Sequence, residues 1–439
     1  MRAEIAYGRG RLTVALPDGA RVLRCRAVEP VGDPGLAVAA ALRRPIGTPP
    51  LRELAAGRKS ACIVVSDITR PVPYRAILPP LLAELDGLVE SVTILVATGT
   101  HRASTPDEKL EMLGPDVVGR YPIVDHDSRD PQAVVELDGR TSSGTVPRVS
   151  RRYVEADLKI LTGLVEPHFM AGYSGGRKAL FPGLTDLRSV QRFHGPQFLE
   201  DPCAASGVLE GNPCHHEATE VARLAGADLI LNVALDLERR IVGVFTGDLD
   251  AAFAAAVEQV DAFCRVEADE PADVVVTSGG GYPLDKTFYQ TVKGMVGALP
   301  VVREGGTILI ASACGEGIGN PEYAGLMLRY DGRHEQFVPD ILARDDVEQD
   351  QWEFEEQCKV LRRVGVEGLV VLTDGIPLDT LRRLSVTPAR MLCDAADPQA
   401  RLQGALDSLL ARQPGARVIA IPDGPYTLAD VRCARLTPH

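Results

Sequence analysis

The sequence lacks three features that would each assign it to a familiar class of proteins. Its nine cysteines include no C-x-x-C spacing, so no disulfide framework is indicated. No stretch approaches the ~20 consecutive apolar residues that a membrane-spanning helix needs. Basic residues are not in excess, since 47 Lys and Arg stand against 60 Asp and Glu, and the formal net charge of -13 repels a phosphate backbone. We therefore expect a soluble cytoplasmic protein without a nucleic-acid or membrane partner.

Short apolar runs alternate with helical patterns along the 439 residues, which is typical of βαβ units and a mostly parallel sheet. The runs are ACIVVS, SVTILVA, DLKILTG and DLILNVA in the first half, and DVVVTS, TILIAS, LVVLTD and RVIAIP in the second. The polar stretch EADEPAD separates the two series. The predicted fold class is α/β, with two α/β domains of mostly parallel sheets and an active-site cleft between them. The domains are an N-terminal one over 1–268 and a doubly wound C-terminal one over 269–439, whose last residues can pack back on the first.

Local patterns predict two further elements. RLTVAL and ARVLRCR, joined by turn residues at 17–19, predict a hairpin within the first ~27 residues. Thr105 followed by Pro and by Glu108 predicts a helix that begins with a capping box, and Gly114 marks its end.

Polar or glycine-rich loops follow four of the predicted strands. The residues of interest in them are Asp67, Thr69, Arg70, His101, His168 and Gly280. Because the carboxyl ends of parallel strands meet at one edge of a sheet, these loops indicate a common site. Two loop histidines near one crevice suit proton transfer on opposite sides of a small substrate. Taken alone, Asp67 and Arg70 could instead be an ion pair that fixes a loop, and a loop histidine could be a surface residue.

The sequence GYSGGRK at 172–178 matches a phosphate-binding loop only in part. Gly175 and Gly176 would expose backbone N–H groups to a phosphate, and Lys178 would add positive charge. A Walker A motif, however, needs glycine before the lysine and Ser or Thr after it, whereas this chain has Arg and Ala there. A contact with a nucleotide phosphate stays possible, but a kinase or ATPase fits poorly.

The segment TDLRSVQRFHGP predicts a short helix with Thr185 as its N-cap and 195–196 as its stop. His194 would lie on the apolar side of the last turn, either as a core histidine or as a metal ligand. One histidine cannot make a metal site, and no H-E-x-x-H motif or cysteine cluster supplies more ligands, so a metal would need most of its ligands from a cofactor. His126 and the pair at 215–216 are interpreted as surface or helix-start residues.

The second half contains one further candidate, the segment DKTFYQTVKG. It predicts a helix that starts at Asp285 and places Gln290 and Lys293 on one face. That face is either an ordinary exposed polar surface or a carboxylate-binding pair.

Taken in order, SDITRPVP, ATGTHR, EPHFMAGYSGGRKALFPG, FHGP, YQTVKG and DQWE closely resemble the lactate racemase family of nickel-pincer-nucleotide 2-hydroxyacid racemases and epimerases. The resemblance covers about residues 5 to 425. It implies a pyridinium-3-thioamide-5-thiocarboxylate mononucleotide that is joined to a lysine and holds nickel (Ni) through two sulfurs and a ring carbon. Lys178 matches the covalent lysine and His194 the histidine that completes the metal.

The resemblance also implies roles for the other candidates. His101 and His168 match the acid/base pair. The matches for substrate binding are Arg70, Tyr289, Gln290, Lys293 and Trp352, and those lining the cofactor are Asp67, Thr69, Gly175, Gly176 and Gly280. The implied reaction inverts a 2-hydroxy acid by proton-coupled hydride transfer through a 2-oxo acid. Implied partners are the 2-hydroxy acid and the maturation proteins that build the cofactor.

Two other functions remain open at this point. One is a nucleotide-dependent phosphotransferase that uses the loop at 172–178, and the other is a non-catalytic nickel- or nucleotide-binding protein. The particular 2-hydroxy acid, the choice between racemisation and epimerisation and the oligomeric state are also open.

Overall fold

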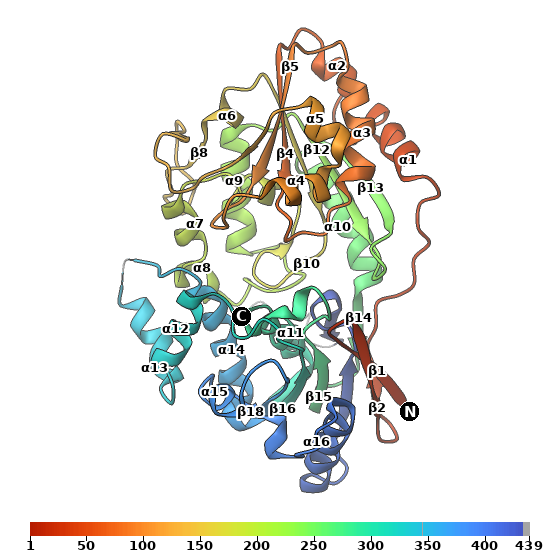
Figure 1. Cartoon of the computed structure of the whole chain (residues 1–439), viewed down its shortest axis with the longest axis vertical. Coiled ribbons are helices and arrows are strands. Elements are labelled where there is room, and N and C mark those ends of the chain that lie inside the picture. The colour runs from red at the N-terminus through yellow and green to blue at the C-terminus, as the bar shows by residue number, and fades with distance from the viewer. Residues whose placement is uncertain (345, 433–439) are drawn as a thin grey trace. The chain divides into compact units, whose positions relative to one another are not determined.

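The computed structural model describes residues 1–344 and 346–432 (Figure 1). The chain forms two compact units. Unit 1 comprises residues 1–26, 195–200 and 263 onwards, and unit 2 comprises 27–194 and 201–262. The predicted boundary at residue 268 falls inside unit 1, and the first 26 residues also belong to that unit. The very end of the chain, for which a return to the first domain was expected, lies outside the described residues.

Unit 2 is built on a six-stranded sheet in the order β13-β12-β9-β4-β5-β6. Its strands are β4 (Ser60–Ser66), β5 (Ser91–Ala97), β6 (Ile123–Asp125), β9 (Leu158–Leu164), β12 (Leu229–Leu235) and β13 (Ile241–Gly247). All neighbours are parallel except β12 and β13. The four apolar runs predicted in the first half are β4, β5, β9 and β12. β4, β9 and β12 are almost wholly buried, as expected for strands covered on both faces, whereas β5 is buried only at residues 94–96.

The first five helices of unit 2 contribute buried residues to a hydrophobic core that they share with this sheet. The helices of unit 2 are α1 (Pro34–Arg43), α2 (Leu51–Ala55), α3 (Tyr74–Leu85), α4 (Pro106–Leu113), α5 (Pro115–Arg120), α6 (Arg151–Val154), α7 (Leu187–Phe193), α9 (Pro213–Ala225) and α10 (Ala251–Cys264), whose last two residues belong to unit 1. Two small ribbons pair β7 (Val134–Glu136) with β8 (Arg148–Ser150), and β10 (Pro167–His168) with β11 (Gly172–Tyr173). The capping box predicted at Thr105 and Glu108 is confirmed at the start of α4.

Unit 1 contains a second six-stranded sheet, in the order β18-β17-β16-β15-β19-β3, in which all neighbours are parallel. The strands are β3 (Arg21–Val22), β15 (Ala272–Ser278), β16 (Val302–Ala311), β17 (Leu369–Leu372), β18 (Thr387–Pro388) and β19 (Val418–Ile421). β14 (Arg265–Ala268) pairs separately with β20 (Leu428–Val431). The α/β class with mostly parallel sheets is therefore confirmed.

The helices of unit 1 include the long helix that begins within the DQWE motif. They are α8 (Pro196–Leu199), α11 (Phe288–Ala298), α12 (Pro321–Arg329), α13 (His334–Leu342), α14 (Gln351–Gly368), α15 (Leu378–Arg382) and α16 (Pro398–Arg412). Short 3-10 turns are η1 (Gly176–Ala179) in unit 2 and η2 (Leu284–Lys286), η3 (Leu299–Val301), η4 (Ala389–Met391) and η5 (Gly424–Tyr426) in unit 1.

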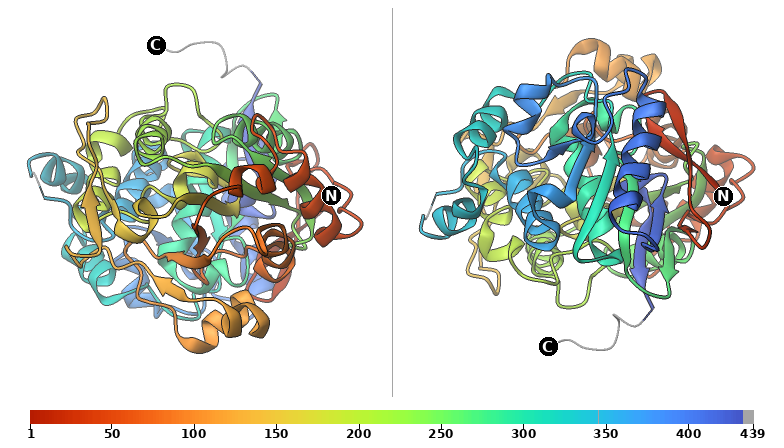
Figure 2. Two further views of the ribbon diagram at one scale, coloured as in Figure 1. Left: turned by 90° about the horizontal axis from the view of Figure 1, so that it is seen from above. Right: turned by 90° about the horizontal axis from the view of Figure 1, so that it is seen from below.

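The hairpin predicted near the N-terminus is wrong in its pairing. β1 (Arg2–Tyr7) pairs with β2 (Gly10–Ala15) around the tight turn at Gly8, which has a φ of 52°. The second predicted strand, β3, instead adds to the edge of the large sheet beside β19. The hairpin β1–β2 packs through β2 on α16 (Figure 2).

Three local predictions also need correction. The N-cap of α7 is Asp186 rather than Thr185, because the Asp186 side chain accepts the Ser189 N–H. The helix expected from Asp285 starts only after Thr287, where α11 begins. His126 is buried and not a surface residue, since its Nε2 lies 2.9 Å from the Thr185 carbonyl oxygen.

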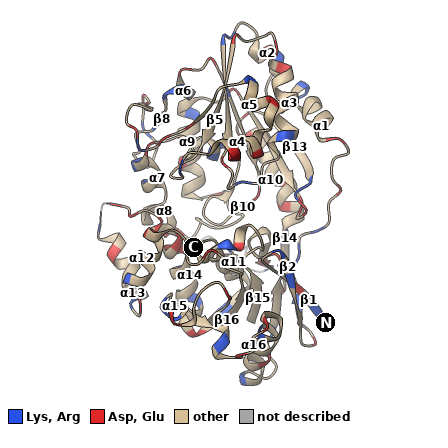
Figure 3. Ribbon diagram, in the orientation of Figure 1, with Lys and Arg blue, Asp and Glu red and all other residues tan. Residues whose placement is uncertain are grey.

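Acidic and basic residues are interspersed along the ribbon of each unit (Figure 3). Within the described ranges, no helix combines the length and the apolar character that crossing a membrane would require.

Candidate active site

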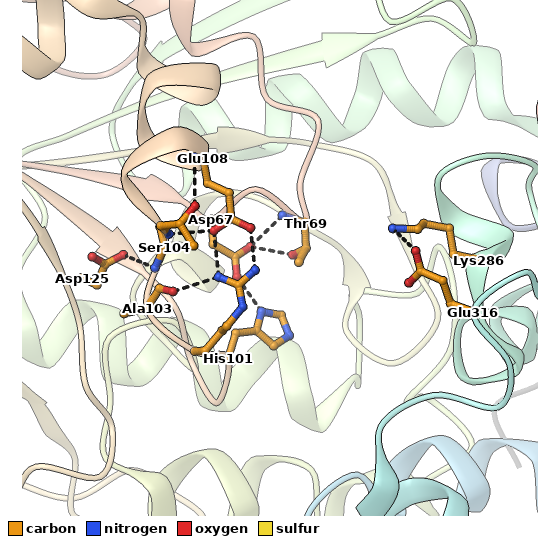
Figure 4. A network of polar contacts seen from close by, with 11 residues as sticks. Asp67, Thr69, His101, Ala103, Ser104, Glu108, Asp125, Lys286 and Glu316 are labelled. Carbon is orange, nitrogen blue, oxygen red and sulfur yellow. Dashed lines mark hydrogen bonds and ion pairs between the residues drawn. The ribbon is translucent and has the colours of Figure 1, made fainter.

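Asp67 and His101 come together at the carboxyl edge of the unit 2 sheet. They follow β4 and β5, which are neighbouring parallel strands, so the loops leaving them are adjacent. Asp67 Oδ2 lies 2.5 Å from His101 Nδ1, while Asp67 Oδ1 accepts the Thr69 hydroxyl at 2.5 Å and the Thr69 N–H at 3.1 Å (Figure 4). The carboxylate is therefore paired with His101 rather than locked in the loop-fixing ion pair considered for Arg70.

The protonation of this pair follows from its surroundings. Burial alone would raise the Asp67 pKa, but the contacts with His101 and Thr69 and the charge of Arg70 outweigh it and lower the pKa. An ionised Asp67 holds the His101 proton on Nδ1, so the lone pair of the neutral ring is on Nε2. The His101 side chain is 53% exposed, which leaves it accessible to a small molecule.

His168 is held in the opposite tautomer. It lies on β10 in the two-stranded ribbon, opposite Gly172 on β11. Its Nδ1 accepts the N–H groups of Met170 at 3.2 Å and Ala171 at 3.3 Å, and its ring stacks on Phe169 with centroids 5.2 Å apart. The proton of the neutral ring is therefore on Nε2. His101 thus presents a base and His168 a proton donor, the two functions that acid/base catalysis requires.

Phe193 brings Lys178 and His194 to a common ring. Lys178 Nζ lies 5.2 Å from the ring centroid of Phe193, and the His194 ring meets the same ring edge to face at 4.9 Å. Phe181 packs against Phe193 from a further side at 5.0 Å. The structure therefore brings together the lysine of η1 and the histidine that caps α7, and this contact was not predicted from the sequence.

His194 has a protonation state that would suit a metal ligand. Its Nδ1 donates to the Val190 carbonyl at 2.8 Å, which puts the lone pair of the ring on Nε2. Burial, together with the charge of Lys178, lowers its pKa to about 3 against the opposing effect of the Val190 carbonyl, so the imidazole is neutral. In residues 1–344 and 346–432 no group of three or more His, Cys, Asp or Glu side chains is placed to hold a metal ion. A metal at His194 would therefore need ligands from a bound group.

The glycine-rich loop is shaped by Asn232 of β12. Gly175 and Gly176 have φ of 83° and 51°, and a Cβ on Gly175 would come within 2.8 Å of Asn232 Oδ1. The same oxygen accepts the Gly176 N–H at 3.1 Å. The loop therefore requires glycine at both positions to approach the sheet closely.

Arg177 explains why the loop departs from Walker A. Its guanidinium is buried 4.1 Å from the ring centroid of Phe253 and donates to the carbonyls of Ala171 and Tyr173. Burial lowers its pKa to about 9. The position before Lys178 thus anchors the loop from inside the protein instead of facing a phosphate.

The candidates of unit 1 gather on α11 and α14. Trp352 Nε1 donates to the Tyr289 hydroxyl at 2.9 Å, and that hydroxyl lies 3.3 Å from Asp350 Oδ1. Burial raises the Tyr289 pKa well above its usual range, so the phenol stays protonated. Gln290 and Lys293 follow on α11 and are half-buried, and the buried Gln290 Oε1 has no hydrogen-bond partner among the described residues. Asp350 is a member of this group that sequence reasoning missed.

Contacts within unit 1 explain why residue 280 is a glycine. Its φ is 92°, and a Cβ there would lie 2.9 Å from Leu284 Cδ2. Its predicted role in lining a cofactor stays a prediction, as does the cleft between the two domains.

Comparisons with known proteins agree with this organisation. The model of the lactate racemase N-terminal domain matches residues 7–207, and that of the lactate racemase C-terminal domain matches residues 267–425. Lactate racemase of Thermoanaerobacterium thermosaccharolyticum is 38% identical over 402 residues, covering 89% of this chain and 92% of the relative. Lactate racemase of Lactiplantibacillus plantarum is 34% identical over 388 residues, covering 87% and 88%.

A solved structure extends the likeness to the fold. The lactate racemase apoprotein of Thermoanaerobacterium thermosaccharolyticum matches with a TM-score of 0.88 and 36% identity, over 98% of this chain and 100% of that one. Because both relatives are racemases, they favour an enzyme over the non-catalytic nickel- or nucleotide-binding protein considered from the sequence. The chain belongs to the lactate racemase family and is an isomerase.

Proposed function

We propose that this enzyme inverts C2 of a 2-hydroxy acid at a nickel-pincer nucleotide tethered to Lys178. The observation that carries the proposal is the placement of Lys178 and a neutral His194 on one phenylalanine ring. A lysine tether and a single imidazole ligand fit a metal whose other ligands belong to the bound group. When bound, that group would supply a ring that accepts and returns the C2 hydrogen with its electron pair.

The chain's own residues would handle the proton and the carboxylate. His101 Nε2 takes the proton of the substrate hydroxyl, and Asp67 stabilises the imidazolium that results. His168 Nε2 carries a proton for the opposite side. Arg70 and Lys293 bind the carboxylate. Gln290 offers a hydroxyl donor its Oε1, which has no partner within residues 1–344 and 346–432. Tyr289, held by Trp352 and Asp350, orients the substrate from unit 1.

The wider setting follows from the same proposal. The relatives carry the name lactate racemase, so lactate is the first substrate to test. We infer a cytoplasmic enzyme that receives its cofactor from maturation proteins. Domain closure over the substrate, which stays a prediction, would retain the 2-oxo acid.

The deciding experiment is chiral analysis of a panel of 2-hydroxy acids with cofactor-loaded enzyme, combined with peptide mass and nickel measurements. We expect inversion of lactate or a larger homologue, a heavy adduct on the Lys178 peptide and loss of nickel in His194→Ala. His101→Ala and His168→Ala should stop turnover while nickel stays bound. His216→Ala, an exposed histidine on α9, serves as the matched control.

Lys159 provides the control for the tether, because its Nζ also lies over an aromatic ring, 5.9 Å from the centroid of Tyr153. Lys159→Ala should keep the adduct, and Lys178→Ala should lose it. Tight binding of ATP with Mg²⁺ and no adduct on Lys178 would instead favour the phosphotransferase. Exchange of the C2 hydrogen with solvent would contradict hydride transfer, since a hydride kept in the site returns without dilution.

A further inference from the structure

Two cysteines far apart in the sequence meet in unit 1. The thiol of Cys25 is a hydrogen-bond partner of the thiol of Cys264. Their backbones are also joined, because the Arg26 N–H donates to the Phe263 carbonyl at 2.8 Å. The Cys25 sulfur lies a further 3.3 Å from the Tyr426 carbonyl oxygen. The two cysteines are therefore neighbours in the chain of the two residues that this main-chain hydrogen bond joins.

The surroundings of Cys25 favour its reactive form. The hydrogen bond with Cys264, helped by Thr427, outweighs burial and lowers the Cys25 pKa. Cys25 is half-buried, so a small reagent can reach it, whereas Cys264 is buried. Cys203 is equally half-buried, but burial and the charge of Asp201 raise its pKa. Since the thiolate is the nucleophile, Cys25 is a better attacking group than Cys203.

We propose that Cys25 and Cys264 form a reversible intramolecular disulfide when the protein meets a small-molecule disulfide such as oxidised glutathione. The Cys25 thiolate attacks one sulfur of the reagent, which breaks the reagent's S–S bond and releases one thiolate. Cys264 then loses its proton and attacks the Cys25 sulfur of the mixed disulfide, releasing the second thiolate. The two protein thiols lose two electrons and two protons, and the reagent gains them as two thiols. In a reducing compartment the pair returns to thiols.

A disulfide between Cys25 and Cys264 would raise the stability of the folded protein because of where the two residues lie in the chain. The chain leaves unit 1 after Arg26 and returns to it for good at Phe263. All residues of unit 2 therefore lie between Cys25 and Cys264 in the sequence. A disulfide between them would close one covalent ring around that unit. Closing a long loop removes conformational freedom from the unfolded chain, and the protection grows with loop length. The oxidised protein should therefore unfold at a higher temperature, by about 5 °C or more.

The test treats the full-length protein with oxidised glutathione, blocks remaining thiols by alkylation and maps the peptides by mass spectrometry. We expect a cross-linked pair of peptides containing Cys25 and Cys264, lighter by two hydrogens than the separate peptides and separated again by dithiothreitol. The unfolding temperature should rise with the cross-link and return on reduction. In the untreated protein, Cys25 should be alkylated at least about threefold faster than Cys203.

Two cysteine variants serve as controls for the proposed disulfide. Cys25→Ser should abolish both the cross-link and the thermal shift, and Cys203→Ser should leave both unchanged. A glutathione adduct that stays on Cys25 without the cross-link would overturn the proposal, as would a cross-link to another cysteine. No change in either thiol under oxidation would overturn it as well. The peptide map of the unmodified chain gives this answer even if the serine variant fails to fold.

Discussion

Replacing Glu355 with glutamine is expected to stabilise unit 1, and increasingly so as the pH rises. Glu355 lies on α14 with no measurable exposure, and neither of its carboxyl oxygens has a hydrogen-bond partner among the described residues. Burial, reinforced by the charges of Glu200 and Glu356, raises its pKa from 4.5 to about 9, although Lys359 and Arg362 oppose the shift. The folded protein must therefore keep this carboxyl protonated.

The sign and size of the effect follow from this raised pKa. The favourable contribution of the protonated carboxyl is complete below pH 4.5 and is lost as the pH rises toward 9, because the unfolded chain ionises over that range. Each pH unit costs about 1.4 kcal/mol of folding free energy. At pH 7 the total is about 3 kcal/mol, against about 1.4 kcal/mol at pH 5.5. Glutamine has nearly the same shape and cannot ionise, so Glu355→Gln should recover these amounts.

Urea unfolding at the two pH values would measure the effect. Trp352 is the only tryptophan and lies on the same helix, so its fluorescence reports on the unfolding of unit 1. Glu367→Gln, on the exposed side of α14, is the matched control and should change stability by less than about 0.5 kcal/mol at either pH. A Glu355→Gln protein whose gain is equal at pH 5.5 and pH 7, or which is less stable than the parent at pH 7, would refute this reasoning.

Two further predictions concern unit 2. Asp67→Asn should lower kcat of the cofactor-loaded enzyme at least about 100-fold while its nickel content stays unchanged, because the amide cannot hold the proton of His101 on Nδ1. Steady-state kinetics combined with metal analysis would check this prediction, and normal turnover would contradict it. Gly175→Ala should destabilise the protein by more than about 2 kcal/mol, because the new Cβ would lie 2.8 Å from Asn232 Oδ1. Gly57→Ala is its control in thermal unfolding, since Gly57 has a similar φ of 76° but open space around it, and equal losses at both positions would contradict the clash.

The strands of both sheets could be predicted because parallel strands covered on both faces need unbroken apolar runs. ACIVVS and DVVVTS have no other reasonable location than the core. The pairing of the N-terminal strands could not be predicted from the sequence. Pro17, Asp18 and Gly19 are strong turn residues, yet the actual turn is at Gly8, and tertiary pairing with β19 decides where the segment after residue 20 goes.

The site could be predicted only as far as its reactive groups. Their motifs carry His101, His168, Lys178 and His194, and the structure places the last two on a shared ring. The ring itself, Phe193, has no sequence signal, since an apolar residue in a helix is ordinarily a core residue. Supporting residues such as this one gain their role from neighbours that only the folded chain supplies.

Helix α8 limits how this enzyme can be divided. The chain enters unit 1 for residues 195–200 alone and then leaves it, and within unit 1 α8 packs on α13 and α14 with Phe198 and Leu199 buried. A fragment spanning 27–262 would therefore carry an apolar turn stripped of its cover. Neither half can be excised, swapped or fused as an intact module by cutting the gene at one point. Recombination between relatives should consequently succeed only when α8, α13 and α14 are inherited from the same parent.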